Sequence, residues 1–420
     1  MSRVLFINMA GHGHVNPTIG LVKELIDRGE NITYIAGKEF RDKVERTGVE
    51  FKGHSNLNMS KYLNGNLNLS DNEALLNTIN EALLDVISTL KEIIEAIFNS
   101  NKKFDYLIYD SAFILGKEIG RVLKIPTISS NTTFTLNKTI ITNILELLQL
   151  DKFKNKLEEI KPKIIEILNS SNYINFAKDL QETYDIKIPS TINEAIGKAM
   201  INIVYTSKYF HPYRETFDES YKFIGPSIID RRESIENIDF NLKNEENKKI
   251  IYISLGTIFN NSNEFYENCF KAFNNMDVKV IMSVGRKTDI NIFKNIPLNF
   301  IVRNYVPQLE ILKHADVFIT HGGMNSTNEG LYYDIPLILI PQFADQPFIA
   351  NRVAELGAGI VIEKNKITPE LLRQSLVRIF SDSNFKINSQ KIGKSLGEAG
   401  GYEKGVDEIF NLKKLYYENK

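Results

Sequence analysis

The sequence of 420 residues carries 51 Lys and Arg against 52 Asp and Glu, for a net charge of −1, and 43% of its residues are hydrophobic. This composition excludes a disordered chain and a collagen-like or disulfide-rich scaffold, and the charge gives no electrostatic reason to expect nucleic acid as a partner. The length indicates two or three domains. The single cysteine, Cys269, and the lack of a run resembling a signal peptide or membrane span favour a cytoplasmic protein without stable membrane insertion.

The first half of the sequence alternates short, β-branched apolar runs with helical patterns, which is typical of a parallel sheet with covered faces. Strands are expected at 4–7, 32–35, 49–51, 106–109 and 201–205. Helices are expected at about 17–28, in the segment that ends before Gly48, and at about 71–98. Residues 131–200 interrupt the alternation with apolar and charged helical stretches, so we interpret them as an insertion.

The second half repeats the same plan after a polar segment, 229–249, that we interpret as a linker. Strands are expected there at 250–254, 278–283, 300–302, 317–320, 336–340 and 360–362. The repetition predicts an α/β protein with two Rossmann-like domains facing across a cleft. We expect the first domain at 1–228, the second at 250–400 and a last helix at 401–420.

Histidines follow the first expected strand, and an acid follows the fourth. In a doubly wound sheet these two strands are neighbours, and ligands bind outside their carboxyl ends. His12 and His14 should therefore lie near Asp110. An imidazole beside a carboxylate is the arrangement of a general base that works near neutral pH. The alternative is that the histidines line a turn while Asp110 caps the next helix.

The same rule applied to the second half predicts a site for a pyrophosphate. Ser254, Gly256 and Thr257 follow its first strand, and 320–326 (Thr-His-Gly-Gly-Met-Asn-Ser) follow its fourth. Adjacent glycines let a ligand approach the main chain, and the amino end of the following helix attracts negative charge. The alternative is a glycine turn with an Asn or Ser cap. Glu329, one turn later, could receive a ribose diol or lie on a solvated helix face.

Several familiar chemistries are poorly supported. A nicotinamide fingerprint lacks its third glycine, because Asn16 stands there. The run 393–395 (Gly-Lys-Ser) is a near miss for a phosphate-binding loop, because Asn388 occupies the first glycine position and no strand precedes it. No Asp-x-Asp pair and no clustered His/Cys spacing indicates a metal site.

Taken in order, these motifs resemble the UDP-glycosyltransferase family, particularly its bacterial macrolide and flavonoid glycosyltransferase branch. The resemblance rests on 13–17 (Gly-His-Val-Asn-Pro), Asp110, 305–308 (Tyr-Val-Pro-Gln), 321–329 and 343–346. It implies the two-domain GT-B fold, with the acceptor in the amino-terminal domain, the donor in the other, and the last helix crossing back. It also implies inversion without a metal ion, with His14 rather than His12 as the base and Asp110 as its partner acid.

The resemblance also implies a donor site for a UDP-sugar. Tyr305 stands where many relatives have a Trp that stacks on the base, although a core role is the alternative. Asp345 and Gln346 would reach the hexose, although Asp345 is also a good helix start. The expected donor-binding residues are Ser254, Gly256, Thr257, Tyr305, Val306, Gln308, His321, Gly323, Asn325, Ser326, Glu329, Asp345 and Gln346.

The sequence thus predicts an inverting hexosyltransferase that needs no cofactor beyond its UDP-sugar co-substrate. The hexose is expected to be glucose and the acceptor a small, largely apolar molecule with a hydroxyl group, covered by the insertion 131–200. Helix-terminal amides and His321 would stabilise the departing diphosphate in place of a metal ion. The alternatives are a nucleotide-sugar epimerase of the same fold, which needs acid and base groups at the sugar C2, and a non-catalytic sugar-nucleotide-binding protein.

Overall fold

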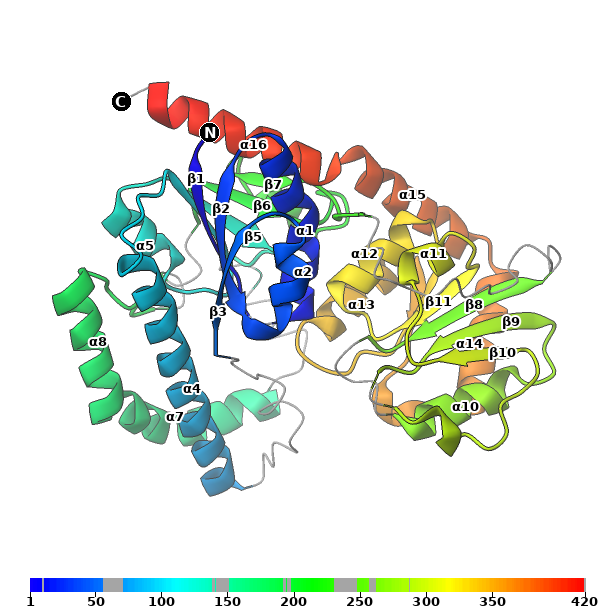
Figure 1. Ribbon diagram of the computed structural model, residues 1–420. Helices are drawn as coiled ribbons and strands as arrows, with labels where there is room; N and C mark the ends of the chain where they lie inside the picture. The colour runs from blue at the N-terminus through cyan, green and yellow to red at the C-terminus, as the bar shows by residue number, and fades with distance from the viewer. Residues whose placement is uncertain are drawn as a thin grey trace. The chain divides into compact units, whose positions relative to one another are not determined.

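The computed structural model describes residues 1–9, 11–55, 71–137, 140, 151–191, 194, 198–229, 248–256, 262–286 and 288–418, and it divides into two compact units (Figure 1). The first unit comprises Met1–Val204, Glu215–Lys222 and Tyr402–Lys420, and the second comprises Tyr205–Arg214 and Phe223–Gly401. Residues 230–247 of the expected linker lie outside the described residues.

The division places Tyr205–Arg214 and residues 223–228 in the second unit, whereas the sequence pattern assigned both to the first domain. Hydrogen bonds explain this difference. Asn328 donates through Nδ2 to the Tyr205 carbonyl at 2.8 Å, and Arg352 donates through Nε to the Phe210 carbonyl at 2.9 Å. These two side chains, from α12 (Met324–Tyr332) and α13 (Gln346–Glu355), hold the segment that follows β6 (Ile201–Val204) within the second unit.

The first unit is built on a seven-stranded sheet with the order β3-β2-β1-β4-β5-β6-β7. The pairings from β3 to β6 are parallel, and β1 lies directly beside β4, as the doubly wound pattern predicted. The strands are β1 (Arg3–Ile7), β2 (Asn31–Gly37), β3 (Glu50–His54), β4 (Tyr106–Asp110), β5 (Thr127–Asn131), β6 (Ile201–Val204) and β7 (Tyr221–Phe223).

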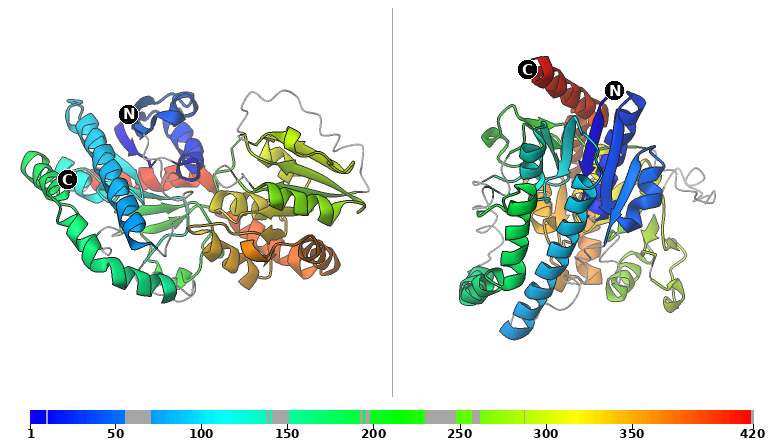
Figure 2. Two further views of the ribbon diagram at one scale, coloured as in Figure 1. Left: turned by 90° about the horizontal axis from the view of Figure 1, so that it is seen from below. Right: turned by 60° about the vertical axis from the view of Figure 1, so that its left-hand side comes forward.

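Helices cover this sheet, and the longest of them, α4, also packs against α7 of the inserted segment. Asp71 caps α4 by accepting hydrogen bonds from the Glu73 and Ala74 amides. The second half of α4 packs on the sheet core, while its first half extends beyond the sheet and packs against α7 (Figure 2). The helices are α1 (His12–Asp27), α2 (Arg41–Glu45), α4 (Asn72–Phe98), α5 (Gly116–Leu123), α7 (Asp151–Leu168), α8 (Ser171–Tyr184) and α16 (Gly401–Glu418).

The last helix, α16, belongs to the first unit although it follows the second in sequence (Figure 1). The Lys413 ammonium donates to the buried Glu30 carboxylate at 2.8 Å, and Arg28 donates to Asp407 at 2.6 Å. The Tyr417 hydroxyl donates to the Asp105 carbonyl at 2.6 Å. The contacts made by Lys413 and Tyr417 bring α16 to residues that precede β2 and β4.

The second unit repeats the doubly wound plan with a six-stranded parallel sheet of order β10-β9-β8-β11-β12-β13. Its central strands are apolar runs buried on both faces, as parallel sheets require. The strands are β8 (Lys249–Ser254), β9 (Val278–Ser283), β10 (Phe300–Arg303), β11 (Val317–Thr320), β12 (Leu337–Leu339) and β13 (Gly359–Val361). The helices are α10 (Asn263–Phe273), α11 (Gln308–Leu312), α12 (Met324–Tyr332), α13 (Gln346–Glu355), α14 (Pro369–Ser381) and α15 (Asn384–Glu398).

Candidate active site

An imidazole–carboxylate pair lies at the carboxyl edge of the first sheet. His14 Nδ1 is 2.8 Å from Asp110 Oδ2, and the Asp110 side chain is fully buried. The other carboxylate oxygen, Oδ1, accepts a hydrogen bond from the Ala112 amide at 2.8 Å. Because a carboxylate only accepts hydrogen bonds, Nδ1 carries the proton in this pair, and Nε2 is the nitrogen that can accept one from a substrate.

The first helix begins earlier than its sequence pattern predicted. It starts at His12, so His14 lies in its first turn, and Pro17, expected at the helix start, lies inside it. The amides of His14 and Val15 both donate to the Gly11 carbonyl at 3.0 Å. This turn points the His14 side chain at β4 while leaving it 37% exposed, so a substrate hydroxyl can reach the ring.

The alternative roles suggested for these residues are only partly correct. Asp110 does stabilise a turn through Ala112, but the next helix begins at Gly116 with Leu115 as its N-cap, so Asp110 does not cap that helix. The ring of His12 packs edge-on against Phe40, with ring centroids 5.1 Å apart. The structure thus brings His14 to Asp110 and turns His12 toward β2 and α2.

Thr132 was not found from the sequence. Its hydroxyl lies 3.4 Å from His14 Nδ1, at the end of β5. The strand β5 was not predicted, although residues 127–130 of this strand precede the expected insertion. The β-branched run 125–128 (Ile-Pro-Thr-Ile) was the signal that could have revealed it, since β5 pairs with β4 and so delivers the next residue to the same edge.

In the second unit, an imidazole lies between two glycines at the corresponding sheet edge. A Cβ atom added at Gly256 would lie 2.7 Å from His321 Cε1, and one added at Gly323 would lie 2.4 Å from His321 Nε2. Both positions therefore require glycine. Burial lowers the pKa of His321 to about 4, because the surrounding protein does not hydrate the imidazolium. The ring is neutral near pH 7 and acts as a hydrogen-bonding group, not as a cation.

The helix α12 begins at this ring. Gly323 is its N-cap residue, and no side chain caps the helix, so the alternative of an Asn or Ser cap is wrong. Asn325 and Ser326 lie within the first turn. The amides at such a helix start are hydrogen-bond donors for an anion, and the helix dipole favours negative charge there.

Glu329 is 2% exposed, which excludes the solvated helix face as its role. Gln308 donates through Nε2 to Glu329 Oε2 at 2.7 Å, and this Nε2 also lies 3.4 Å from the Ser326 hydroxyl. The amide oxygen of Gln308 accepts a hydrogen bond from the buried Tyr252 hydroxyl at 3.3 Å. Gln308, which belongs to the 305–308 motif, thus fixes the position of the Glu329 carboxylate.

Tyr305 and Val306 have different environments. Tyr305 is 37% exposed, so it is not a core residue, and the Arg286 guanidinium lies 5.0 Å from the centre of its ring. Val306 is 2% exposed, so its side chain belongs to the core and only its main chain can contact a ligand.

The start of α13 contains the two residues expected at the hexose. Asp345 is the N-cap residue but makes no side-chain capping bond, so the helix-start alternative lacks its hydrogen bond. The amide oxygen of Gln346 accepts bonds from the Gln342 and Phe343 amides at 2.8 and 3.2 Å. Gln346 therefore holds its own loop, in which Ala344 has a φ of 58°, and only its amide nitrogen can donate to a sugar.

The remaining expected donor residues lie at the same edge or outside the described residues. Ser254 ends β8, and its hydroxyl accepts a bond from the Gly256 amide at 3.3 Å. Thr257 lies outside the described residues.

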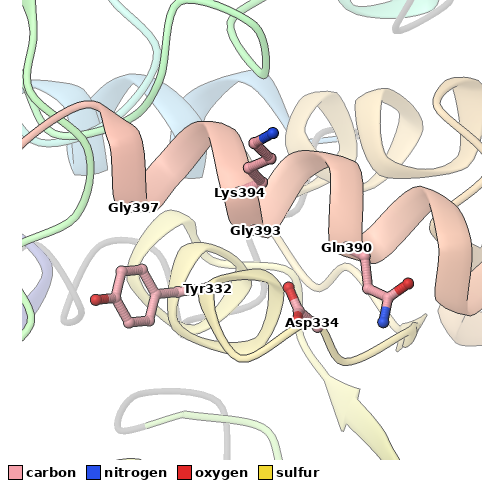
Figure 3. A pocket seen from close by; sticks show the side chains of 6 residues that line it. All are labelled: Tyr332, Asp334, Gln390, Gly393, Lys394 and Gly397. Carbon is pink, nitrogen blue, oxygen red and sulfur yellow. The ribbon is translucent and has the colours of Figure 1, made fainter.

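The near miss for a phosphate-binding loop is part of a helix. Gly393 lies in α15, where an added Cβ atom would lie 2.2 Å from Asp334 Oδ1 and 2.4 Å from the Leu331 carbonyl oxygen. This glycine therefore allows α15 to approach α12 closely. A shallow cavity of about 490 Å³ opens beside this contact (Figure 3), and it is lined by Tyr332, Asp334, Gln390, Gly393, Lys394 and Gly397. None of these residues belongs to the expected donor site.

Comparison with known proteins identifies the family. A family model described as "UDP-glucoronosyl and UDP-glucosyl transferase" matches residues 38–395, and the chain belongs to this family. "Uncharacterized UDP-glucosyltransferase YojK" of Bacillus subtilis (strain 168) is 36% identical, with 99% of this chain and 98% of the relative covered. The oleandomycin glycosyltransferase of Streptomyces antibioticus is 26% identical, with 97% and 90% covered. The crystal structure of CalG4, the calicheamicin glycosyltransferase, has a TM-score of 0.76 at 24% identity, with 99% and 98% covered.

The protein is a glycosyltransferase that takes its sugar from a nucleotide-sugar donor. The predicted α/β class with two parallel-sheet domains of the GT-B type is confirmed, as is the resemblance to the bacterial macrolide and flavonoid branch. Among the described residues, no helix is both long and apolar enough to span a membrane. The same part of the chain contains no group of three or more His, Cys, Asp or Glu residues suited to hold a metal ion.

Proposed function

We propose that the protein is an inverting, metal-independent enzyme that transfers a hexose, glucose in particular, from a UDP-sugar to a hydroxyl group of a small, largely apolar acceptor. The first unit binds the acceptor and the second binds the donor. The observation that carries this proposal is the 2.8 Å hydrogen bond between His14 and the buried Asp110. This bond leaves the imidazole ready to accept a proton through Nε2.

The reaction balances with these groups alone. His14 Nε2 takes the proton of the acceptor hydroxyl while the hydroxyl oxygen forms a bond to the sugar C1 on the face opposite the diphosphate. The bond between C1 and the diphosphate oxygen breaks, and the electron pair leaves with UDP. Asp110 stays ionised and stabilises the imidazolium that forms, as in other carboxylate–histidine pairs.

The donor part of the proposal assigns the leaving diphosphate to the start of α12. The amides of its first turn and the neutral ring of His321 donate hydrogen bonds to the phosphate oxygens, which carry the developing charge. Glu329 receives the ribose hydroxyls, and the base stacks on the exposed ring of Tyr305. Asp345 and the amide nitrogen of Gln346 bind hexose hydroxyls. These interactions require no metal ion.

The apolar acceptor is supported by two exposed apolar side chains in the segments that follow β4 and β5. Ile114 follows β4 and Leu136 follows β5, and they are 39% and 37% exposed. The inserted helices α7 and α8 are proposed to cover the acceptor. The name of the Streptomyces antibioticus relative, oleandomycin glycosyltransferase, supports a small-molecule acceptor. A cytoplasmic location also belongs to the proposal, because the single, buried Cys269 needs no oxidising compartment.

The test is turnover of UDP-glucose with a panel of phenolic and macrolide acceptors in wild-type, His14→Ala and Asp110→Asn proteins. Loss of a general base lowers turnover by about 10²- to 10⁴-fold, and we expect UDP binding to stay nearly unchanged. His12→Ala is the matched control and should retain activity. Comparable turnover in His14→Ala would refute the proposal, and NMR of the product should show the inverted anomeric configuration.

A further inference from the structure

Three buried polar side chains lie where the first sheet meets the start of α1: Asn8 follows β1, Tyr34 lies in β2, and Thr18 belongs to α1 itself. Asn8, Thr18 and Tyr34 are each fully buried. Asn8 donates through Nδ2 to the Tyr34 hydroxyl at 2.7 Å and to the His14 carbonyl at 3.2 Å. The Tyr34 and Thr18 hydroxyls are 2.8 Å apart, and the Thr18 hydroxyl donates to the Val15 carbonyl at 2.8 Å. The cluster therefore contacts the main chain of two consecutive residues in the turn that carries the proposed base.

The two main-chain carbonyl oxygens determine which group donates in each of these hydrogen bonds. A carbonyl oxygen cannot donate, so the amide nitrogen of Asn8 must face His14, and the Thr18 proton must point to Val15. Tyr34 then accepts from Asn8 and donates to Thr18. Burial raises the pKa of the Tyr34 hydroxyl, so it stays protonated and able to donate. One ordered series of hydrogen bonds thus runs from Asn8 through Tyr34 to Thr18 and the Val15 carbonyl, which are both in α1.

The first turn of α1 has a local reason to need this support. Pro17 has no amide proton, so the hydrogen bond that position 17 would make to the Gly13 carbonyl is missing. The contacts from Asn8 and Thr18 to the adjacent carbonyls restrain the main chain at the same turn.

Stability alone does not explain the presence of Asn8. Its amide oxygen is buried and has no hydrogen-bond partner in the part of the chain that the structure describes. Burial of an unpaired amide oxygen is unfavourable, and an apolar side chain would avoid that cost. The aromatic ring of Tyr34 stacks on Phe6 with ring centroids 4.7 Å apart, a contact that phenylalanine would also make. The polar groups of Asn8 and Tyr34 are therefore explained by their hydrogen bonds to His14 and Thr18 of α1.

We propose that Asn8, Tyr34 and Thr18 are positioning residues that hold the His14 main chain so that its ring keeps the Asp110 contact and presents Nε2 to the acceptor. This inference rests on the proposed function, because it assumes that His14 is the base. A small displacement of a base lowers the rate steeply, so the effect should be seen in turnover rather than in substrate binding.

The test compares Tyr34→Phe and Thr18→Val with Tyr106→Phe. Tyr106 is an equally buried tyrosine of the same sheet whose hydroxyl donates to Glu30 at 3.1 Å, and it lies at the opposite end of β4 from Asp110. We expect about tenfold lower kcat in the first two variants, with acceptor KM and UDP Kd unchanged, and wild-type kcat in Tyr106→Phe. The acid limb of the pH–rate profile should move to lower pH in Tyr34→Phe, because a looser Asp110 contact stabilises the imidazolium less.

Urea unfolding of each variant separates a structural effect from a positioning effect, and kcat is expressed per folded protein. Equal kcat and equal pH profiles in Tyr34→Phe and Tyr106→Phe would overturn the inference. His14→Ala is measured alongside. If His14→Ala keeps its turnover, the proposed function itself fails; if His14→Ala is inactive while Tyr34→Phe and Thr18→Val match wild type, only the positioning role fails.

Discussion

Replacement of Glu329 by alanine tests the proposed ribose contact and the buried hydrogen bond to Gln308 together. Glu329 is 2% exposed, and it accepts a hydrogen bond from the side-chain amide of Gln308 at 2.7 Å. Hydrogen bonds to a charged group contribute about 1.5–3 kcal/mol. Loss of such bonds to the ribose in Glu329→Ala should therefore raise the Kd for UDP by roughly 10- to 150-fold.

The assay is calorimetric titration with UDP and with its 2′-deoxy and 3′-deoxy analogues. Wild-type protein should bind at least one deoxy analogue more weakly than UDP, whereas Glu329→Ala should bind all three alike, because the carboxylate that distinguishes them is gone. Glu310→Ala is a suitable control, since Glu310 is an exposed glutamate on α11 that pairs with Lys313 at 2.7 Å. Its Kd values should match those of wild type.

The substitution also removes the acceptor of Gln308. A buried donor left without its partner costs about 1–3 kcal/mol, so Glu329→Ala should lower the free energy of unfolding by that amount or more. Unchanged UDP affinity in Glu329→Ala, or discrimination against the deoxy analogues that persists in it, would refute the reasoning.

Three further predictions concern pH, the sugar and metal ions. The pKa of His321 in the folded protein is about 4, below its ordinary value of 6.5. Between these two pH values the unfolded chain therefore binds more protons than the folded protein. The contribution of His321 to the free energy of unfolding should be fully present above about pH 6.5 and fall by on the order of 3 kcal/mol toward pH 4. Urea titrations across this range should show a flatter dependence in His321→Gln, and an identical slope would contradict the assignment. Gln346→Ala should reduce the preference for UDP-glucose over deoxysugar donors, measured as a ratio of kcat/KM values. The same variant should have a lower unfolding midpoint, because the Gln346 amide oxygen accepts hydrogen bonds from the Gln342 and Phe343 amides. An unchanged ratio would leave Gln346 with a structural role alone. EDTA should leave turnover unchanged, and a sharp loss reversed by added metal would contradict the metal-free mechanism.

The sequence by itself determined the central strands of the two sheets and the sheet edges at which the candidate site residues lie. Continuous apolar runs such as 250–253 predict strands buried on both faces, and the alternation of strands with helices predicts parallel pairing. Because the first and fourth strands of a doubly wound sheet are neighbours, the pattern brought His14 and Asp110 together across 96 positions of sequence. It also placed Gly256 beside His321.

Only the tertiary structure decided what depends on contacts between distant segments. The start of α1 at His12 was not predicted, because Pro17 is a good helix start by local preference and lies inside this helix instead. The burial of Glu329 and the use of the Gln346 oxygen by its own loop depend on neighbours that no periodicity reveals.

The assignment of Tyr205–Arg214 to the second unit has the same cause. Asn328 and Arg352 donate hydrogen bonds to main-chain carbonyls of this segment, so it belongs to the second unit although it directly follows a strand of the first. Local propensity and hydrophobic period report which face of an element is buried. The partner that covers this face, and the hydrogen bonds that a buried polar group finds there, are determined when the elements pack.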